Sequence, residues 1–309
     1  MAEPIGVLLA AGLGTRLRPL TLARPKPLVP LHGIPLLEFG LRQLEAAGCH
    51  RVAVNGHHLA EPLRDWLRAR AQRRPGTELL FFAEPELLGV GGGLARMARE
   101  LPPGPLLVQN GDVLHNADLG RLRAAAGEAE ITLVLGGEPR VAEWRDGRVA
   151  GLRDAERSTH GFTGIHLWSE AGRARLETWS RADLIPLLQQ EMAAGRRPLG
   201  LRLAEDGGGS LWEDLGHLSR YLPLHRELMA REDYRRLLAD LGLQPAWDAA
   251  RGVSAGAGSR LPDDARDCVA WDGVDWEGAA TGCVFLDGVR GKGLAAGEIL
   301  LAGRQTGAC

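Results

Sequence analysis

The sequence predicts an α/β fold with a mainly parallel sheet and helices on both faces. Over the first two-thirds of the chain, short apolar runs alternate with stretches of helical periodicity. Such alternation requires right-handed crossovers between parallel strands, which is the Rossmann-like class of α/β fold. The expected strands are 5–9, 51–55, 78–82, 105–109, 130–135 and 164–168, and the expected helices are 36–47, 59–71, 92–100, 119–126, 183–195 and 218–241.

A short internal repeat near the end of the chain predicts a different architecture. Residues 268–274 and 283–289 share the pattern CVxxDGV at a step of 15 residues. Short apolar runs closed by Asp-Gly turns at a regular step are typical of stacked coils. We therefore expect a catalytic domain over 1–241, a linker over 242–251 and a β-solenoid-like tail of the left-handed β-helix type over 252–309, with Cys268 and Cys283 inside the stack.

Composition narrows the class of protein. The 309 residues contain 37 basic and 39 acidic side chains, which gives a net charge of −2. A balanced charge argues against nonspecific nucleic-acid binding, and the lack of a long apolar run argues against a membrane span. No secretion signal is recognisable, and the four cysteines are far apart. We expect reduced thiols and a cytoplasmic protein.

The most informative segment follows the first expected strand. It runs from Leu9 through AAGLGTR to a lysine between two prolines, Lys26. Glycines let a backbone approach phosphate, and an arginine can grip phosphate with two hydrogen bonds. Lysine occurs only at positions 26 and 292, so a compact ammonium is favoured at 26 in a chain that otherwise uses arginine. Leu17 breaks the dinucleotide fingerprint GxGxxG, and no Walker A GK[ST] follows.

Together, GxGTRLxPLT and PKPLVP within 12–30 resemble the sugar-1-phosphate nucleotidyltransferase family, and the resemblance continues as ordered motifs over 3–225. It implies an enzyme of EC 2.7.7 type that joins an NTP and a sugar 1-phosphate to give an NDP-sugar and pyrophosphate. Similar compact members are N-acetylmuramate-1-phosphate uridylyltransferases and mannose-1-phosphate guanylyltransferases. It also implies sugar-nucleotide biosynthesis, as for cell-envelope polysaccharide.

The resemblance assigns site residues to three groups. The residues expected to bind the nucleotide are Leu9, Ala10, Ala11, Gly12, Gly14, Thr15, Arg16, Glu84, Gly89 and Gly91. Those expected to bind the sugar phosphate are Asn110, Arg153, Thr163 and Gly164. Those expected to act in catalysis are Arg16, Lys26 and Asp112. Glu84 could accept a hydrogen bond from a ring N–H of uracil, thymine or guanine. Mg²⁺ prefers hard oxygen ligands and often takes one or two carboxylates, which the resemblance identifies as Asp112 and Asp214.

Two positions depart from the family pattern. The lysine of an EKP motif is absent from 153–157, where Arg153 or Arg157 would have to replace it, and His217 stands where the family usually has Thr. These departures favour one alternative, a noncatalytic regulatory subunit that binds a sugar nucleotide through the same pocket. The retained Lys26, Asp112 and Asp214 argue against it. A dinucleotide oxidoreductase is disfavoured by Leu17 and by the Pro-Lys-Pro segment. The identity of the sugar, the nucleobase and homo-oligomer formation through 252–309 stay open.

Overall fold

The computed structural model describes residues 3–153, 156–203, 210–302 and 304–308. The chain divides into two compact units. Residues 1–12 and 40–214 form unit 1, and residues 13–39 and 215–309 form unit 2. The predicted boundaries at 241/242 and 251/252 stay predictions.

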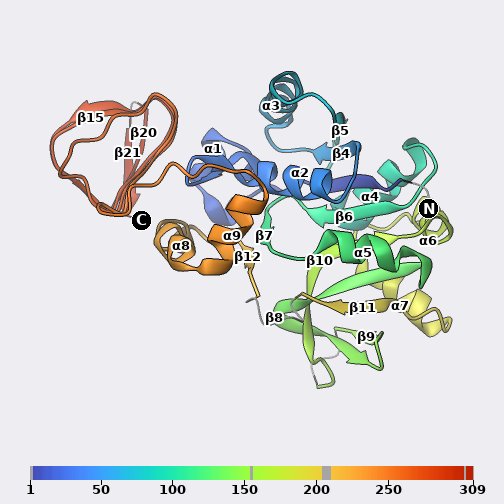
Figure 1. The fold of residues 1–309 in the computed structure, drawn as a ribbon. Helices are drawn as coiled ribbons and strands as arrows, with labels where there is room; N and C mark the ends of the chain where they lie inside the picture. The colour runs from blue at the N-terminus through green and yellow to red at the C-terminus, as the bar shows by residue number, and fades with distance from the viewer. Residues whose placement is uncertain (1–2, 154–155, 204–209, 303, 309) are drawn as a thin grey trace. The chain divides into compact units, whose positions relative to one another are not determined.

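Unit 1 is built on an eight-stranded sheet with the order β11-β9-β8-β10-β6-β1-β4-β5 (Figure 1). Its strands are β1 (Ile5–Leu9), β4 (Arg51–Gly56), β5 (Glu78–Ala83), β6 (Leu106–Asn110), β8 (Ile131–Arg145), β9 (Arg148–Leu152), β10 (His160–Trp168) and β11 (Leu199–Arg202). A separate two-stranded sheet pairs β7 (Val113–His115) with β12 (Trp212–Asp214). All six strands expected from the sequence form. The ends of β1, β4, β5 and β6 shift by at most one residue, whereas β8 continues ten residues further than expected and β10 begins four residues earlier.

The sheet is mixed, which corrects the expectation of a mainly parallel one. Strands β6, β1, β4 and β5 are parallel, whereas β10 runs antiparallel to both β6 and β8, and β8 and β9 form a hairpin. The hairpin turns at Asp146-Gly147, both with positive φ. An Asp-Gly pair suits the tight turn of a two-residue hairpin, and this signal for β9 was present in the sequence.

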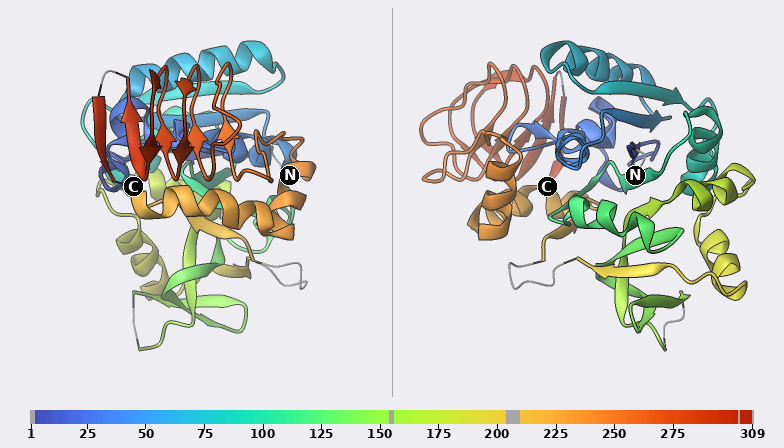
Figure 2. Two further views of the ribbon diagram at one scale, coloured as in Figure 1. Left: turned by 90° about the vertical axis from the view of Figure 1, so that its left-hand side faces the viewer. Right: turned by 45° about the vertical axis from the view of Figure 1, so that its right-hand side comes forward.

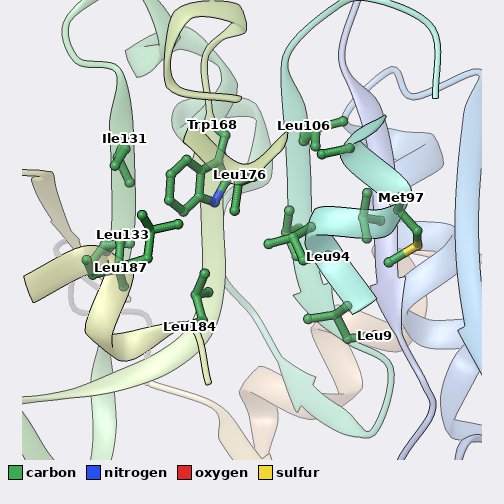
Figure 3. Close-up of a cluster of buried hydrophobic side chains, with 14 of the residues drawn as sticks. Leu9, Leu94, Met97, Leu106, Ile131, Leu133, Trp168, Leu176, Leu184 and Leu187 are labelled. Carbon is green, nitrogen blue, oxygen red and sulfur yellow. The ribbon is translucent and has the colours of Figure 1, made fainter. Parts of the chain in front are cut away.

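Helices cover both faces of the sheet in unit 1, as expected. Alternate residues of β1, Val7 and Leu9 among them, belong to a buried cluster with Leu94 and Met97 (Figure 3). The opposite face of β1 packs on another helix, because a Cβ at Gly6 would lie 2.9 Å from Leu44. The helices are α2 (Leu36–Ala46), α3 (Ala60–Arg73), α4 (Gly89–Glu100), α5 (Leu119–Ala124), α6 (Glu170–Glu177) and α7 (Ile185–Ala193).

Unit 2 contains short elements from two distant parts of the sequence. Its helical elements are the 3₁₀ turns η1 (Thr15–Leu17) and η2 (Lys26–Leu28) and the helices α1 (Leu20–Ala23), α8 (Leu218–Ala230) and α9 (Glu232–Asp240), and β2 (Pro30–Leu31) pairs with β3 (Ile34–Pro35). The single helix expected over 218–241 is interrupted at Arg231, whose backbone is extended. The acidic residues Glu232 and Asp233 then occupy the first turn of α9, where they favour a new helix start.

The last part of unit 2 forms parallel ladders in which paired residues lie 15 positions apart, and it ends in one antiparallel pair, 298–301 with 304–308. Val269 pairs with Val284, and Ala280 with Ala295. The repeated strands lie side by side as a stack in Figure 2. The strands are β13 (Ser254–Ala255), β14 (Val269–Ala270), β15 (Asp275–Glu277), β16 (Ala280–Thr281), β17 (Val284–Phe285), β18 (Arg290–Lys292), β19 (Ala295–Ala296), β20 (Glu298–Leu301) and β21 (Arg304–Ala308). Cys268 and Cys283 are both fully buried.

Every helix in the described part of the chain is too short or too polar to cross a membrane.

Candidate functional site

In unit 1 the candidate residues follow the carboxyl ends of the parallel strands. Strands β1, β4, β5 and β6 end at Leu9, Gly56, Ala83 and Asn110, and their parallel pairing brings these ends to one edge of the sheet. Open α/β sheets bind ligands at this edge, because the loops leaving the strands are free to diverge there. The glycine loop after β1, Glu84 after β5 and Asp112 after β6 all leave from it.

Asn55, which the sequence analysis did not select, links two of these loops. Its side-chain carbonyl accepts a hydrogen bond from the Ala10 N–H at 2.7 Å, and its amide donates to the Glu84 carboxylate at 2.7 Å. A Cβ at Gly93 would lie 2.6 Å from Glu84 Oε1, so a glycine is needed beside this pair. The signal in the sequence was a polar side chain near the end of an otherwise apolar strand.

Glu84 is itself buried, with 4% of its surface exposed. One carboxylate oxygen accepts from Asn55 and the other from the Leu88 N–H at 3.1 Å. Two donors from the protein therefore hold this carboxylate in place. The adjacent Gly89 and Gly91 begin α4, and the Gly91 N–H donates to the Ala182 carbonyl at 2.7 Å.

The two carboxylates expected to bind metal lie beside the pair of strands β7 and β12. Asp112 lies in the turn between β6 and β7, and the antiparallel pairing of β7 with β12 sets Asp214 opposite Val113, the next residue after Asp112. The turn is fixed by the Gly111 N–H, which donates to the Leu9 carbonyl at 2.9 Å.

A two-carboxylate set of this kind fits Mg²⁺, which often uses one or two carboxylates and completes its shell with phosphate oxygens and water. Among the described residues there is no cluster of three or more His, Cys, Asp or Glu side chains suited to a metal.

A buried network lies beneath the Asp112 turn. His115 hydrogen-bonds to Gln109 and to Gln43, and Gln109 donates to the Gly40 carbonyl at 2.9 Å. Burial lowers the pKa of His115 to about 3, so its ring is neutral at pH 7. This network ties β6 and β7 to α2, and no sequence motif indicated it.

The sugar-side candidates have well-defined neighbours in unit 1. Asn110 and Gly164 touch, since a Cβ at Gly164 would lie 2.6 Å from the Asn110 amide nitrogen. The Thr163 hydroxyl is buried and donates to the Val134 carbonyl at 2.7 Å, while its own carbonyl accepts from Trp212. Arg153 pairs with Asp183 at 3.0 Å. Residues 154 and 155 of the stretch where the family carries its lysine lie outside the described residues.

In unit 2 the glycine loop and Lys26 pack together. Gly14 has φ of 62°, a left-handed conformation that favours glycine, and a Cβ there would lie 3.3 Å from the Lys26 Cβ and 2.8 Å from Thr21. The Thr21 hydroxyl donates to the Gly14 carbonyl at 2.8 Å. The loop leads into the short 3₁₀ turn η1, which begins at Thr15.

His217 contacts a predicted catalytic residue. The Arg16 guanidinium donates to His217 Nε2 at 3.1 Å. The residue that departs from the family pattern thus lies in contact with Arg16.

Two further histidines of unit 1 make local hydrogen bonds. His57 Nδ1 donates to the Glu84 carbonyl at 2.8 Å, and His160 Nδ1 lies 2.8 Å from the Thr159 hydroxyl.

Comparison with known proteins identifies the family of this fold. Residues 5–147 match the family model described as nucleotidyl transferase. A mannose-1-phosphate guanylyltransferase from Mycobacterium tuberculosis is 37% identical over 138 residues, which are 43% of this chain and 38% of that protein. The matched region thus spans well under half of that relative's length.

A second relative is matched over nearly its whole length. The N-acetylmuramate alpha-1-phosphate uridylyltransferase of Neisseria meningitidis serogroup B is 30% identical over 224 residues, 69% of this chain and 94% of that protein. The fold also matches a solved Bacillus anthracis structure described as a glucose-1-phosphate thymidylyltransferase, with a TM-score of 0.61, 15% identity, and coverage of 75% of this chain and 99% of that one. The chain therefore belongs to the nucleotidyl transferase family.

Proposed function

We propose that this chain joins an NTP and a sugar 1-phosphate to give an NDP-sugar and pyrophosphate. A phosphate oxygen of the sugar 1-phosphate attacks the α-phosphorus of the NTP. The bond from that phosphorus to the oxygen bridging to the β-phosphate breaks, and pyrophosphate leaves with the electron pair. The observation that carries the proposal is the β7–β12 pairing, which sets the metal-type carboxylate Asp214 opposite Val113, next to Asp112, in a chain of this family.

The residues have distinct proposed roles. The attacking oxygen is ionised at pH 7, so no general base is required, and catalysis depends on positioning two anions and stabilising the charge that develops. Lys26 and Arg16 stabilise the triphosphate and its leaving group. Asp112 and Asp214 would hold Mg²⁺, which supplies charge neutralisation to phosphate oxygens when bound.

The substrate-binding roles also come from the resemblance. The glycine loop from Leu9 to Arg16 binds phosphates, and the segment from Glu84 to Gly91 binds the base. Asn110, Thr163, Gly164 and Arg153 bind the sugar phosphate. Because the Glu84 oxygens and the Thr163 hydroxyl have internal hydrogen-bond partners, these two residues would act mainly by fixing the backbone beside the ligand.

The architecture of the tail, the cellular location, the biological role and self-association are also proposals. The 15-residue parallel ladders support a β-solenoid of the left-handed β-helix type for 252–309. A cytoplasmic location, a role in cell-envelope polysaccharide synthesis and self-association through the tail are proposed from sequence alone.

A pyrophosphate-release assay tests the function. The purified protein with Mg²⁺ is offered GTP, UTP, dTTP, CTP or ATP, each combined with a panel of sugar 1-phosphates that includes mannose and N-acetylmuramate. Release that requires one NTP and one sugar phosphate together supports the transferase and names both substrates. Nucleotide-sugar binding without release for any pair would instead favour the noncatalytic regulatory subunit.

A further inference from the structure

The tail contacts the short segment that carries Lys26 within unit 2. Arg24 lies two residues before Lys26, directly after α1. Its guanidinium donates to Asp287 Oδ2 at 2.7 Å and to Asp272 Oδ2 at 2.6 Å. These carboxylates are the equivalent aspartates of the two CVxxDGV repeats, so one arginine bridges two successive coils.

The same arginine also stacks on the tail. Its guanidinium carbon lies 5.1 Å from the centre of the Trp271 ring, which is fully buried. The Arg24 side chain is 20% exposed. A planar guanidinium can make a bidentate contact with a carboxylate while stacking on an aromatic ring, and a lysine cannot. The contact is therefore specific for arginine.

A second chain of hydrogen bonds holds the other end of the segment. The Trp271 indole N–H donates to the Tyr221 hydroxyl at 2.9 Å, and that hydroxyl donates to the Pro30 carbonyl at 2.7 Å. Between Arg24 and Pro30, η2 closes on itself, because the Leu28 N–H donates to the Pro25 carbonyl at 2.8 Å. The segment 24–30 is thus fixed at both ends.

We propose that the coils at 268–289 position Lys26 for catalysis, with Arg24 and Tyr221 as positioning residues that act through the Lys26 segment. This inference rests on the proposed function for its kinetic consequence. The tail would then be required for turnover although none of its residues touches the reacting groups. Small misplacements of a charge-stabilising group are costly, and a shift of about 1 Å can lower a rate by up to about 10²-fold.

Kinetics give the first test. Arg24→Ala should lower kcat by about tenfold, and Arg24→Lys should lie between Arg24→Ala and the unchanged protein. In a Lys26→Ala background, Arg24→Ala should have no further effect, because its action passes through Lys26. A merely structural role would lower kcat by the same factor in both backgrounds, and that result would overturn the proposal.

Lysine labelling gives a second readout that does not depend on activity. The chain contains two lysines, buried Lys26 and exposed Lys292, so acylation of each can be followed by mass spectrometry with Lys292 as the internal reference. Arg24→Ala and Asp287→Asn should each raise the labelling rate of Lys26 by about threefold or more and leave Lys292 unchanged. Tyr221→Phe should act in the same direction.

A matched control uses another ion pair to the same tail. Arg226 on α8 pairs with Asp267 but does not contact 24–30 in any described interaction, so Arg226→Ala should change neither kcat nor Lys26 labelling. If wild-type protein releases no pyrophosphate while Arg24→Ala still exposes Lys26, the proposed function fails and the positioning contact stands. If wild type is active and Arg24→Ala alters neither readout, the positioning proposal is wrong.

Discussion

The two units each bury a charged candidate residue, Glu84 in unit 1 and Lys26 in unit 2, but they fix it by different means. Glu84 is held by a neutral amide and a backbone N–H next to the sheet. The segment of Lys26 is held by a charged pair and a tyrosine bond to residues as far as 263 positions along the chain. The first arrangement is local to the sheet edge, whereas the second depends on the tail being folded. Substitutions in the two units should therefore impair the protein in different ways.

The largest expected effect is in the carboxylates of unit 1. Asp112→Asn removes a charge from the proposed metal pair and should lower Mg²⁺-dependent turnover by about 10³-fold or more, since metal charge stabilisation is worth several kcal/mol. The measurement is pyrophosphate release as a function of Mg²⁺. Asp118→Asn is the control, because Asp118 caps α5 and asparagine caps equally well. Unchanged Mg²⁺-dependent activity in Asp112→Asn would refute the ligand assignment.

The second largest expected effect is the loss of kcat on removing Lys26 of unit 2. Lys26→Ala should keep the fold and lower kcat by about 10²–10³-fold, the loss seen on removing one preorganised charge-stabilising donor. Lys292→Ala serves as the control for loss of a lysine. Turnover close to wild type in Lys26→Ala would exclude Lys26 from catalysis.

Asn55→Ala probes the local network of unit 1. It leaves the buried Glu84 carboxylate and the Ala10 N–H each short of a partner, so the free energy of unfolding should fall by about 1–3 kcal/mol and nucleotide affinity should weaken. Urea unfolding and nucleotide titration measure the two effects. Arg51→Ala, which breaks a more exposed pair on the same strand, should do neither. Wild-type stability in Asn55→Ala would show that Glu84 does not need this amide.

Both units should also share a pH dependence of stability. Burial lowers the pKa of His115 and His166 to about 3 in unit 1, and burial, only partly offset by a hydrogen bond to the His225 carbonyl, lowers that of His32 to about 4 in unit 2. An unfolded histidine has a pKa of about 6.5, so the unfolded state binds more protons below that pH. The free energy of unfolding should therefore fall from about pH 6.5 downward, by up to about 1.4 kcal/mol per pH unit for each histidine.

Urea midpoints at pH 7.5, 6.0 and 5.0 measure this trend. The variant His115→Gln should be less stable at pH 7.5 but show a shallower pH dependence, because one buried titrating ring is gone. A midpoint that does not change between pH 7.5 and 5.0 would contradict the buried neutral state of these histidines.

Local signals in the sequence predicted much of the fold. Apolar runs predicted the buried parallel strands nearly to the residue, as at β1 and β6, because a buried strand needs a continuous apolar segment. The hairpin β8–β9 and the break at Arg231 were missed. The Asp146-Gly147 turn and the acidic pair Glu232 and Asp233 at the start of α9 were both present as local signals but were not used.

The sequence by itself determined the family, through the glycine loop, the Pro-Lys-Pro lysine and the ordered aspartates. Binding phosphate and metal requires particular residue types at fixed spacing, so these motifs can be recognised without a structure. Tertiary structure alone decided how these residues are held. The register of β7 with β12 sets Asp214 opposite the neighbour of Asp112, Asn55 links two loops, and Arg24 bridges two coils. These contacts join residues far apart in the chain, and no local pattern encodes them, because a distant hydrogen bond forms only after both segments have packed.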